Sequence, residues 1–81
     1  MIQELDIVVL ARDFDVHGLE QGDIGTVVHK YSEEAFEVEF ATAEGRTVAV
    51  LTLKEGDIRA LQSREILHVR EISQAANVST G

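Results

Sequence analysis

The most constraining feature of this sequence is a series of short segments rich in β-branched and aromatic residues, separated by turns that contain glycine. In segment 36–40, three apolar residues alternate with Glu37 and Glu39, which is the period of a strand with one buried face. Further strands are predicted over residues 5–11, 24–31 and 47–53, and a short fifth strand over 58–61. Because no long helical pattern occurs among them, we predict an all-β domain, a small barrel or sandwich of four or five short strands.

Turn chemistry supports this strand pattern. Gly22 permits a positive φ in the turn over 19–23, and Glu44-Gly45 is typical of a hairpin turn. Residues 54–57 predict another turn or a single turn of 3₁₀ helix. Gly25 lies inside the second strand, which predicts either a bulge or a close approach of another backbone.

Composition and charge exclude several classes of protein. The chain has 81 residues, enough for one domain, and it contains no Cys, which excludes disulfides, Cys-ligated metals and a thiol nucleophile. The formal net charge of −8 argues against nucleic-acid binding, which requires clustered Lys and Arg. The apolar run Ile7–Ala11 is far shorter than the roughly 20 residues that span a bilayer, and the first residues lack a basic region. We therefore expect a cytoplasmic protein that does not bind membranes.

The last fifth of the chain differs from the rest. Residues 1–61 carry the whole net charge, whereas residues 62–81 are neutral. We expect a barrel over 1–61, a C-terminal strand or helix over 62–73 and a flexible tail over 74–81. Apolar residues recur every three positions, which fits a helix capped by Ser63, but segment 67–71 also alternates like a strand, and β-branched residues favour the strand slightly. The apolar residues of this segment must pack on the barrel or on another chain, so they are the predicted oligomer contact: Ile66, Leu67, Val69 and Ile72.

Two sets of residues resemble known proteins. The run Gly22-Asp23-Ile24-Gly25-Thr26-Val27-Val28 resembles the turn and strand of SH3-like barrels, including the KOW-type modules of ribosomal proteins and transcription factors. Together with segments 5–10, 36–40 and 47–53, in the same order and at similar spacing, it resembles a family of small bacterial domains of unknown function over roughly residues 3–72. This resemblance implies an SH3-like barrel and brings no established reaction, catalytic residue or cofactor. The chain departs from nucleic-acid-binding KOW modules because it lacks their basic, aromatic surface.

One loop offers a partial set of metal ligands. Asp13, Asp15 and His17 are spaced so that all three side chains point to one side if the loop is extended. Nothing in the sequence supplies a fourth ligand, so an ordinary polar loop is the favoured interpretation.

Four residues are candidates for binding a partner. Glu37 and Glu39 lie on the polar face of the third predicted strand, where they form either a solvated surface or a docking surface for a basic protein. Phe14 and Tyr31 are candidates to line a peptide groove, although partial burial under the long loop is the favoured interpretation.

These observations predict a non-catalytic, acidic protein-interaction module that forms a homo-oligomer and needs no cofactor. An alternative is an antitoxin or immunity-type protein that masks a basic toxin, because small acidic proteins can neutralise basic partners by charge. A metal-dependent enzyme that uses Asp13, Asp15 and His17 is the least favoured hypothesis.

Overall fold

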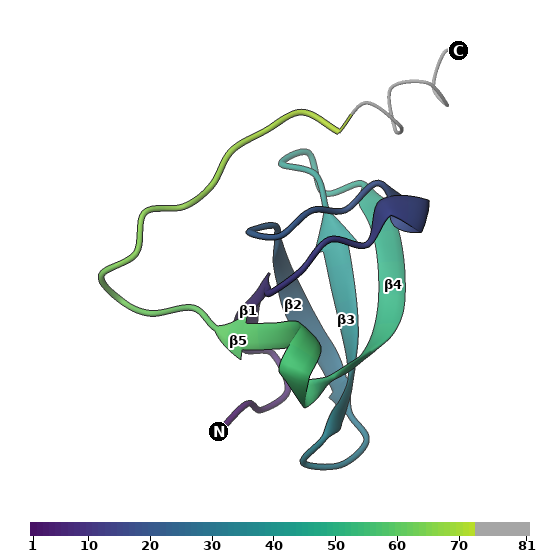
Figure 1. The fold of residues 1–81 in the computed structure, drawn as a ribbon, viewed down its shortest axis with the longest axis vertical. Helices are drawn as coiled ribbons and strands as arrows, with labels where there is room; N and C mark the ends of the chain where they lie inside the picture. The colour runs from purple at the N-terminus through teal and green to yellow at the C-terminus, as the bar shows by residue number, and fades with distance from the viewer. Residues whose placement is uncertain (73–81) are drawn as a thin grey trace.

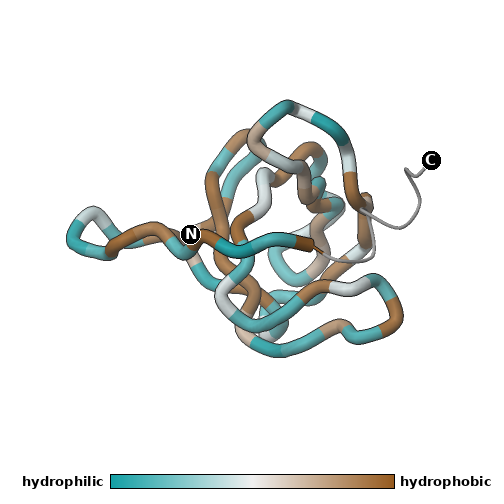
Figure 2. Tube along the Cα trace, turned by 90° about the horizontal axis from the view of Figure 1, so that it is seen from above, coloured by the Kyte–Doolittle hydropathy of each residue, from teal (hydrophilic) through white to brown (hydrophobic). Residues whose placement is uncertain are grey.

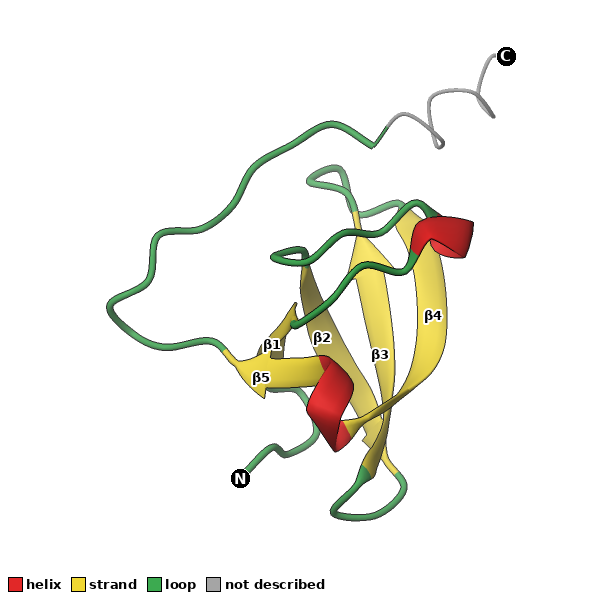
Figure 3. Cartoon of the chain, in the orientation of Figure 1, coloured by secondary structure: helices red, strands yellow, loops and turns green. Residues whose placement is uncertain are grey.

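The fold is a single antiparallel sheet of five strands, seen in a computed structural model that describes residues 1–72 (Figure 1). The strands are β1 (Ile7–Leu10), β2 (Ile24–Lys30), β3 (Ala35–Ala41), β4 (Thr47–Lys54) and β5 (Ile58–Ala60), in the spatial order β4-β3-β2-β1-β5. Two short 3₁₀ helices, η1 (Asp15–His17) and η2 (Glu55–Asp57), lie in the connections, and the part of the chain described contains no α-helix (Figure 3). The prediction of an all-β fold is therefore confirmed. Within residues 1–72, no helix is long and apolar enough to cross a membrane.

The predicted closure into a barrel is not observed in the hydrogen bonding of the sheet. Strands β4 and β5 are its two edges, and no ladder joins them. The reason is that η2 turns the chain after Lys54, so that β5 leaves β4 and pairs with β1, Ala60 lying opposite Val8. The sheet nevertheless curls enough to bring the last strand beside the first (Figure 1).

The core lies on the concave side of this curled sheet. The alternation in β3 is confirmed, because Phe36, Val38 and Phe40 are buried while the two glutamates between them are not. Strand β1 is buried on both faces from Val8 to Leu10, as its uninterrupted apolar run predicts. Figure 2 shows this patterning as hydrophilic and hydrophobic stretches that succeed one another along the chain. The core cluster consists of Val8, Leu10, Leu19, Val27, Phe36, Val38, Phe40, Leu53 and Ile58.

Two glycines have the roles that their positions predict. At Gly25 a Cβ atom would lie 2.7 Å from Val38 Cγ1 and 3.0 Å from the carbonyl oxygen of Glu39, so the close approach is confirmed. The bulge in β2 falls later, between Val27 and His29. Gly45 adopts a φ of 90° in the hairpin turn between β3 and β4, and its N–H donates to the Thr42 carbonyl oxygen at 2.8 Å.

Residues 62–72, called the C-terminal arm below, form neither the strand nor the helix expected for this region. The arm leaves β5, projects to one side and returns over the end of the sheet near the β3–β4 turn (Figures 1 and 2). Glu65 fixes the start of the projection, because its side chain bonds to the Gln62 N–H and to Arg59. In the described part of the chain, no hydrogen bond between backbone groups joins residues 66–72 to the sheet, so no strand forms. The expected tail over 74–81 lies outside the described residues.

Candidate functional site

A buried carboxylate lies in the turn that precedes β2. The Asp23 N–H donates to the Glu20 carbonyl oxygen at 3.0 Å, and the Glu20 N–H donates to Asp23 Oδ2 at 2.8 Å. Two further bonds, between the backbone groups of Leu10 and those of Gly22 and Asp23, fasten the turn to β1. Gly22 supplies the positive φ of 98° that the turn requires. The Gly-Asp pair thus fixes both the turn and the position of the carboxylate.

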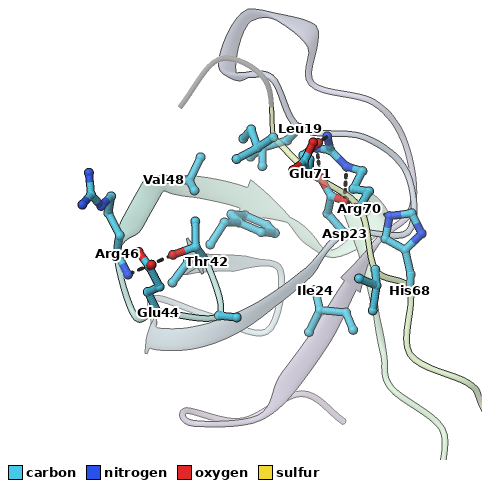
Figure 4. Close-up of a pocket in the computed structure, with 15 residues that line it drawn as sticks. Leu19, Asp23, Ile24, Thr42, Glu44, Arg46, Val48, His68, Arg70 and Glu71 are labelled. Atoms are coloured by element: carbon cyan, nitrogen blue, oxygen red, sulfur yellow. Dashed lines mark hydrogen bonds and ion pairs between the residues drawn. The ribbon is translucent and has the colours of Figure 1, made fainter. Parts of the chain in front are cut away.

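Arg70 of the C-terminal arm binds this carboxylate with two nitrogen atoms of its guanidinium group. Arg70 Nε lies 2.8 Å from Asp23 Oδ1, and Nη2 lies 2.6 Å from Oδ2 (Figure 4). Nη2 also donates to the Gly18 carbonyl oxygen at 2.8 Å. His68 adds a contact of 3.2 Å between its Nε2 and Asp23 Oδ1. Bidentate pairing of this kind is the strong and orientation-specific form of an Arg–carboxylate contact.

The electrostatics of Asp23 follow from these contacts. Within residues 1–72, Asp23 is the one buried charged residue. Burial raises the pKa of Asp23, but the hydrogen bonds from Arg70 and the Glu20 amide outweigh it, so the pKa lies below its ordinary value. The same hydrogen bond raises the pKa of Arg70. Both groups are therefore charged at neutral pH.

The returning part of the arm turns two polar side chains inward and three of its four apolar side chains outward. His68 and Arg70 face Asp23, and Ile72 packs against the core. By contrast, Ile66, Leu67 and Val69 are 95%, 58% and 92% exposed. Of the four residues predicted as an oligomer contact, Ile72 packs on the domain, and the domain leaves the other three uncovered. The side chains do alternate as in a strand, but the buried carboxylate selects the face that carries Arg70.

A groove with a volume of about 880 Å³ adjoins the Asp23–Arg70 pair. Leu19, Ile24, Phe40 and Val48 line its apolar part, and residues 68–72 form one wall. At the other end lie Thr42, Glu44 and Arg46 of the β3–β4 turn (Figure 4). The site therefore combines one acidic anchor with a partly apolar groove.

The three candidate metal ligands of the β1–β2 loop are not arranged as a metal site. Asp13 accepts a hydrogen bond from the Gln21 N–H at 2.8 Å, while Asp15 and His17 are the ends of η1. Across residues 1–72, no group of three or more His, Asp or Glu side chains is arranged to hold a metal ion. The hypothesis fails because the loop forms a 3₁₀ turn there instead of the extended chain that would align the three side chains.

Phe14 and Tyr31 do not line one groove. Phe14 precedes η1 and Tyr31 follows β2, and these lie at opposite ends of the sheet (Figure 1). Phe14 packs against the core under the Arg12 guanidinium, whose carbon lies 4.1 Å from the ring centroid. Tyr31 packs edge-on against His29 with ring centroids 4.6 Å apart.

Glu37 and Glu39 lie on the outer face of β3, as the alternation predicts, and both accept hydrogen bonds there. Glu37 accepts from the hydroxyls of Tyr31 at 3.0 Å and Thr52 at 2.9 Å, and Glu39 accepts from Thr47 at 2.6 Å. The bond to Glu37 raises the pKa of Tyr31. The acidic residues therefore tie β3 to β4 as well as facing solvent.

Fold and site together define a small all-β domain whose C-terminal arm is held by side chains on a buried carboxylate. The chain belongs to a family described as a domain of unknown function (DUF4926), whose model matches residues 4–60. The match ends with β5, so it includes Asp23 but not the arm, and it is shorter than the resemblance over residues 3–72 that the motifs indicate. Comparison with curated proteins and with solved structures found no match.

Sequence reasoning does not identify Asp23, His68 and Arg70 as a site. Asp23 belongs to a pattern that predicts a turn. Arg70 belongs to a segment with no net charge, which is interpreted from its apolar residues alone. A signal is nevertheless present: Arg70 and Ile72 are two positions apart, so an extended segment places both on one face, and a charged side chain that packs beside an apolar one needs a partner.

Proposed function

We propose that this chain is a non-catalytic protein-interaction module that self-associates through the outer face of its C-terminal arm. The observation that carries the proposal is the exposure of Ile66, Leu67 and Val69 on a segment fastened by Arg70. A contiguous apolar stretch held outward in one conformation is typical of a surface that another protein covers. Because the inner face of the arm is fixed, this stretch loses little conformational entropy when a partner binds.

The proposal includes an SH3-like arrangement for the domain. Two features support it: β1 to β4 follow one another as antiparallel neighbours, and β5 returns to pair with β1. This pairing places the first and last strands side by side, as closure of a small barrel requires.

Light scattering on the full chain tests the proposed self-association. We expect wild-type protein to be an oligomer and the double variant Leu67→Asp/Val69→Asp to be a monomer, because a buried apolar contact does not tolerate two carboxylates. Val16→Asp is the matched control, since Val16 is 84% exposed but lies on η1. A monomeric mass for the wild-type chain would contradict the proposal.

A further inference from the structure

The inner face of the arm contacts the domain as a bound peptide contacts its receptor. The residues run in extended form, and every second side chain, at positions 68, 70 and 72, points to the domain. The polar contacts between residues 66–72 and the domain come from the side chains of His68 and Arg70. Recognition by alternate side chains of an extended segment is a common mode of peptide binding.

The receiving surface is built without the arm. Its polar groups are the Asp23 carboxylate and the Gly18 carbonyl, and both come from the loop between β1 and β2. Backbone bonds to Leu10 and the Glu20 amide hold the Asp23 turn in place. Gly22 lies beside the His68 ring, where a Cβ would be in ordinary van der Waals contact, 3.5 Å from His68 Nδ1. The surface is therefore preorganised for a cationic side chain.

The receptor and its present occupant are separable parts of the chain. The family model covers residues 4–60, which includes the whole receiving loop and excludes the arm. Between β5 and His68 the chain projects from the sheet, with Ile66 and Leu67 exposed (Figure 2). Nothing in the described residues other than the contacts at 68, 70 and 72 fastens the returning part of the arm.

We propose that Asp23, the Gly18 carbonyl and the adjoining groove form a binding site for an extended peptide of a partner protein. The peptide carries an Arg and, two positions later, a large aliphatic residue, and residues 68–72 occupy the site in cis as an internal ligand. The inference goes beyond the proposed self-association, because it concerns the inner face of the arm and a different surface of the domain.

The chemistry of the site selects Arg over Lys. Three acceptor oxygens, two from Asp23 and one from Gly18, receive Nε and Nη2 of one planar guanidinium group. An ammonium group is a single point donor on a flexible stem and cannot form this pattern. Glu20 lies 3.6 Å from Arg70 Nε and adds negative charge at the rim. The net charge of −8 favours the approach of a basic peptide.

The tethered arm sets the minimum affinity that a partner peptide needs to occupy the site. A tethered segment acts at an effective concentration in the millimolar range, so a free peptide of equal affinity competes poorly with it. A partner peptide must therefore bind the site more tightly than the tethered arm does in order to displace it. Weakening the arm's own Arg70 contact is expected to open the site.

Titration of ¹⁵N-labelled full-length protein with a capped peptide, Ile-Leu-His-Val-Arg-Glu-Ile, tests the proposal. This is the sequence of residues 66–72. We expect saturable shift changes at residues 18–24 in the Arg70→Ala variant, and binding at least about tenfold weaker in wild type because its own arm competes. Arg64→Ala is the matched control and should behave as wild type, since the described structure gives the Arg64 side chain no hydrogen bond or ion pair.

Two further measurements keep the test independent of variant folding. A peptide in which Gln replaces the Arg should not bind Arg70→Ala, and adding Asp23→Asn to that variant should abolish binding of the parent peptide. Absence of saturable binding to Arg70→Ala, or equal binding of the Gln peptide, overturns the proposal. Light scattering identifies the other occupant, on a mixture of full-length Arg70→Ala and Asp23→Asn chains that both also carry Leu67→Asp/Val69→Asp, which removes the proposed self-association: a heterodimer would assign the site to a second copy and overturn its assignment to a partner protein. None of these results depends on Leu67 and Val69, so failure here leaves the proposed self-association to its own test.

Discussion

Asp23 determines how the C-terminal arm lies on the domain. A carboxylate that is buried must be paired or hydrogen-bonded, and only one of its bonds comes from its own turn. The arm supplies the rest through Arg70 and His68. Satisfying this group places Arg70 and His68 on the inner side of the arm and leaves Leu67 and Val69 exposed.

The stability contributed by Asp23 is predicted to depend on pH. Its folded pKa lies below the ordinary value of 3.8, so its contribution is complete above that value and is lost as the pH falls through the folded pKa. Urea unfolding between about pH 6 and pH 2.5 should show this loss in wild type and a smaller loss in Arg70→Ala. Arg64→Ala should keep the wild-type slope. Equal slopes in all three proteins would contradict the pairing.

Gly25 provides a second prediction for a single residue. A Cβ at this position would lie within 3.0 Å of Val38 Cγ1, Phe40 Cε1 and the Glu39 backbone. We expect Gly25→Ala to lower the free energy of unfolding by about 1–3 kcal/mol, because the core must shift to admit a methyl group. Gly56→Ala is the control, since a Cβ there meets nothing within 4 Å. An unchanged urea midpoint for Gly25→Ala would show that β3 can shift to admit the methyl group with no loss of stability.

The strands are predictable because their patterns are local, whereas the arm is not. In β3 the alternation of Phe36 and Val38 with Glu37 follows directly from the pleat of a strand. In the arm, two periodicities overlap, and hydrophobicity alone does not show which side chains face the domain. The correct face depends on Asp23, 47 positions away from Arg70, and no local pattern encodes that contact. The same limit explains why the metal hypothesis fails at the loop that forms η1.

The junction between β4 and β5 yields a prediction about an element. Asp57 Oδ2 accepts a hydrogen bond from the Lys54 N–H at 2.9 Å, and its Oδ1 lies 2.8 Å from Arg12 Nε. Asp57→Ala should destabilise the domain by about 0.5–2 kcal/mol, because η2 loses the bond at its first turn and its tie to Arg12. Urea unfolding measures the change, with Glu55→Ala in the same helix as control. A larger effect of Glu55→Ala would contradict the role assigned to Asp57.

At the scale of the whole molecule, the domain and the arm differ in what holds them. All nine residues of the buried cluster lie between Val8 and Ile58, and the arm adds to it only the partly buried Ile72. Backbone ladders join the strands, whereas side chains alone fasten the returning part of the arm. The end of the family match at residue 60 falls at the boundary between these two parts.

A chain that ends after Leu61 is therefore expected to fold. It should lose about 1–3 kcal/mol of stability, because Asp23 loses its partner and Ile72 no longer covers the core. Circular dichroism with urea unfolding measures this, and a chain that ends after Ile72 is the control because it keeps every described contact of the arm. If the shorter chain is unfolded in buffer while the control is folded, the arm is part of the cooperative unit and cannot act as a displaceable ligand. If both fold, and only the shorter chain binds the Arg-containing peptide without competition, the division into receptor and internal ligand is supported.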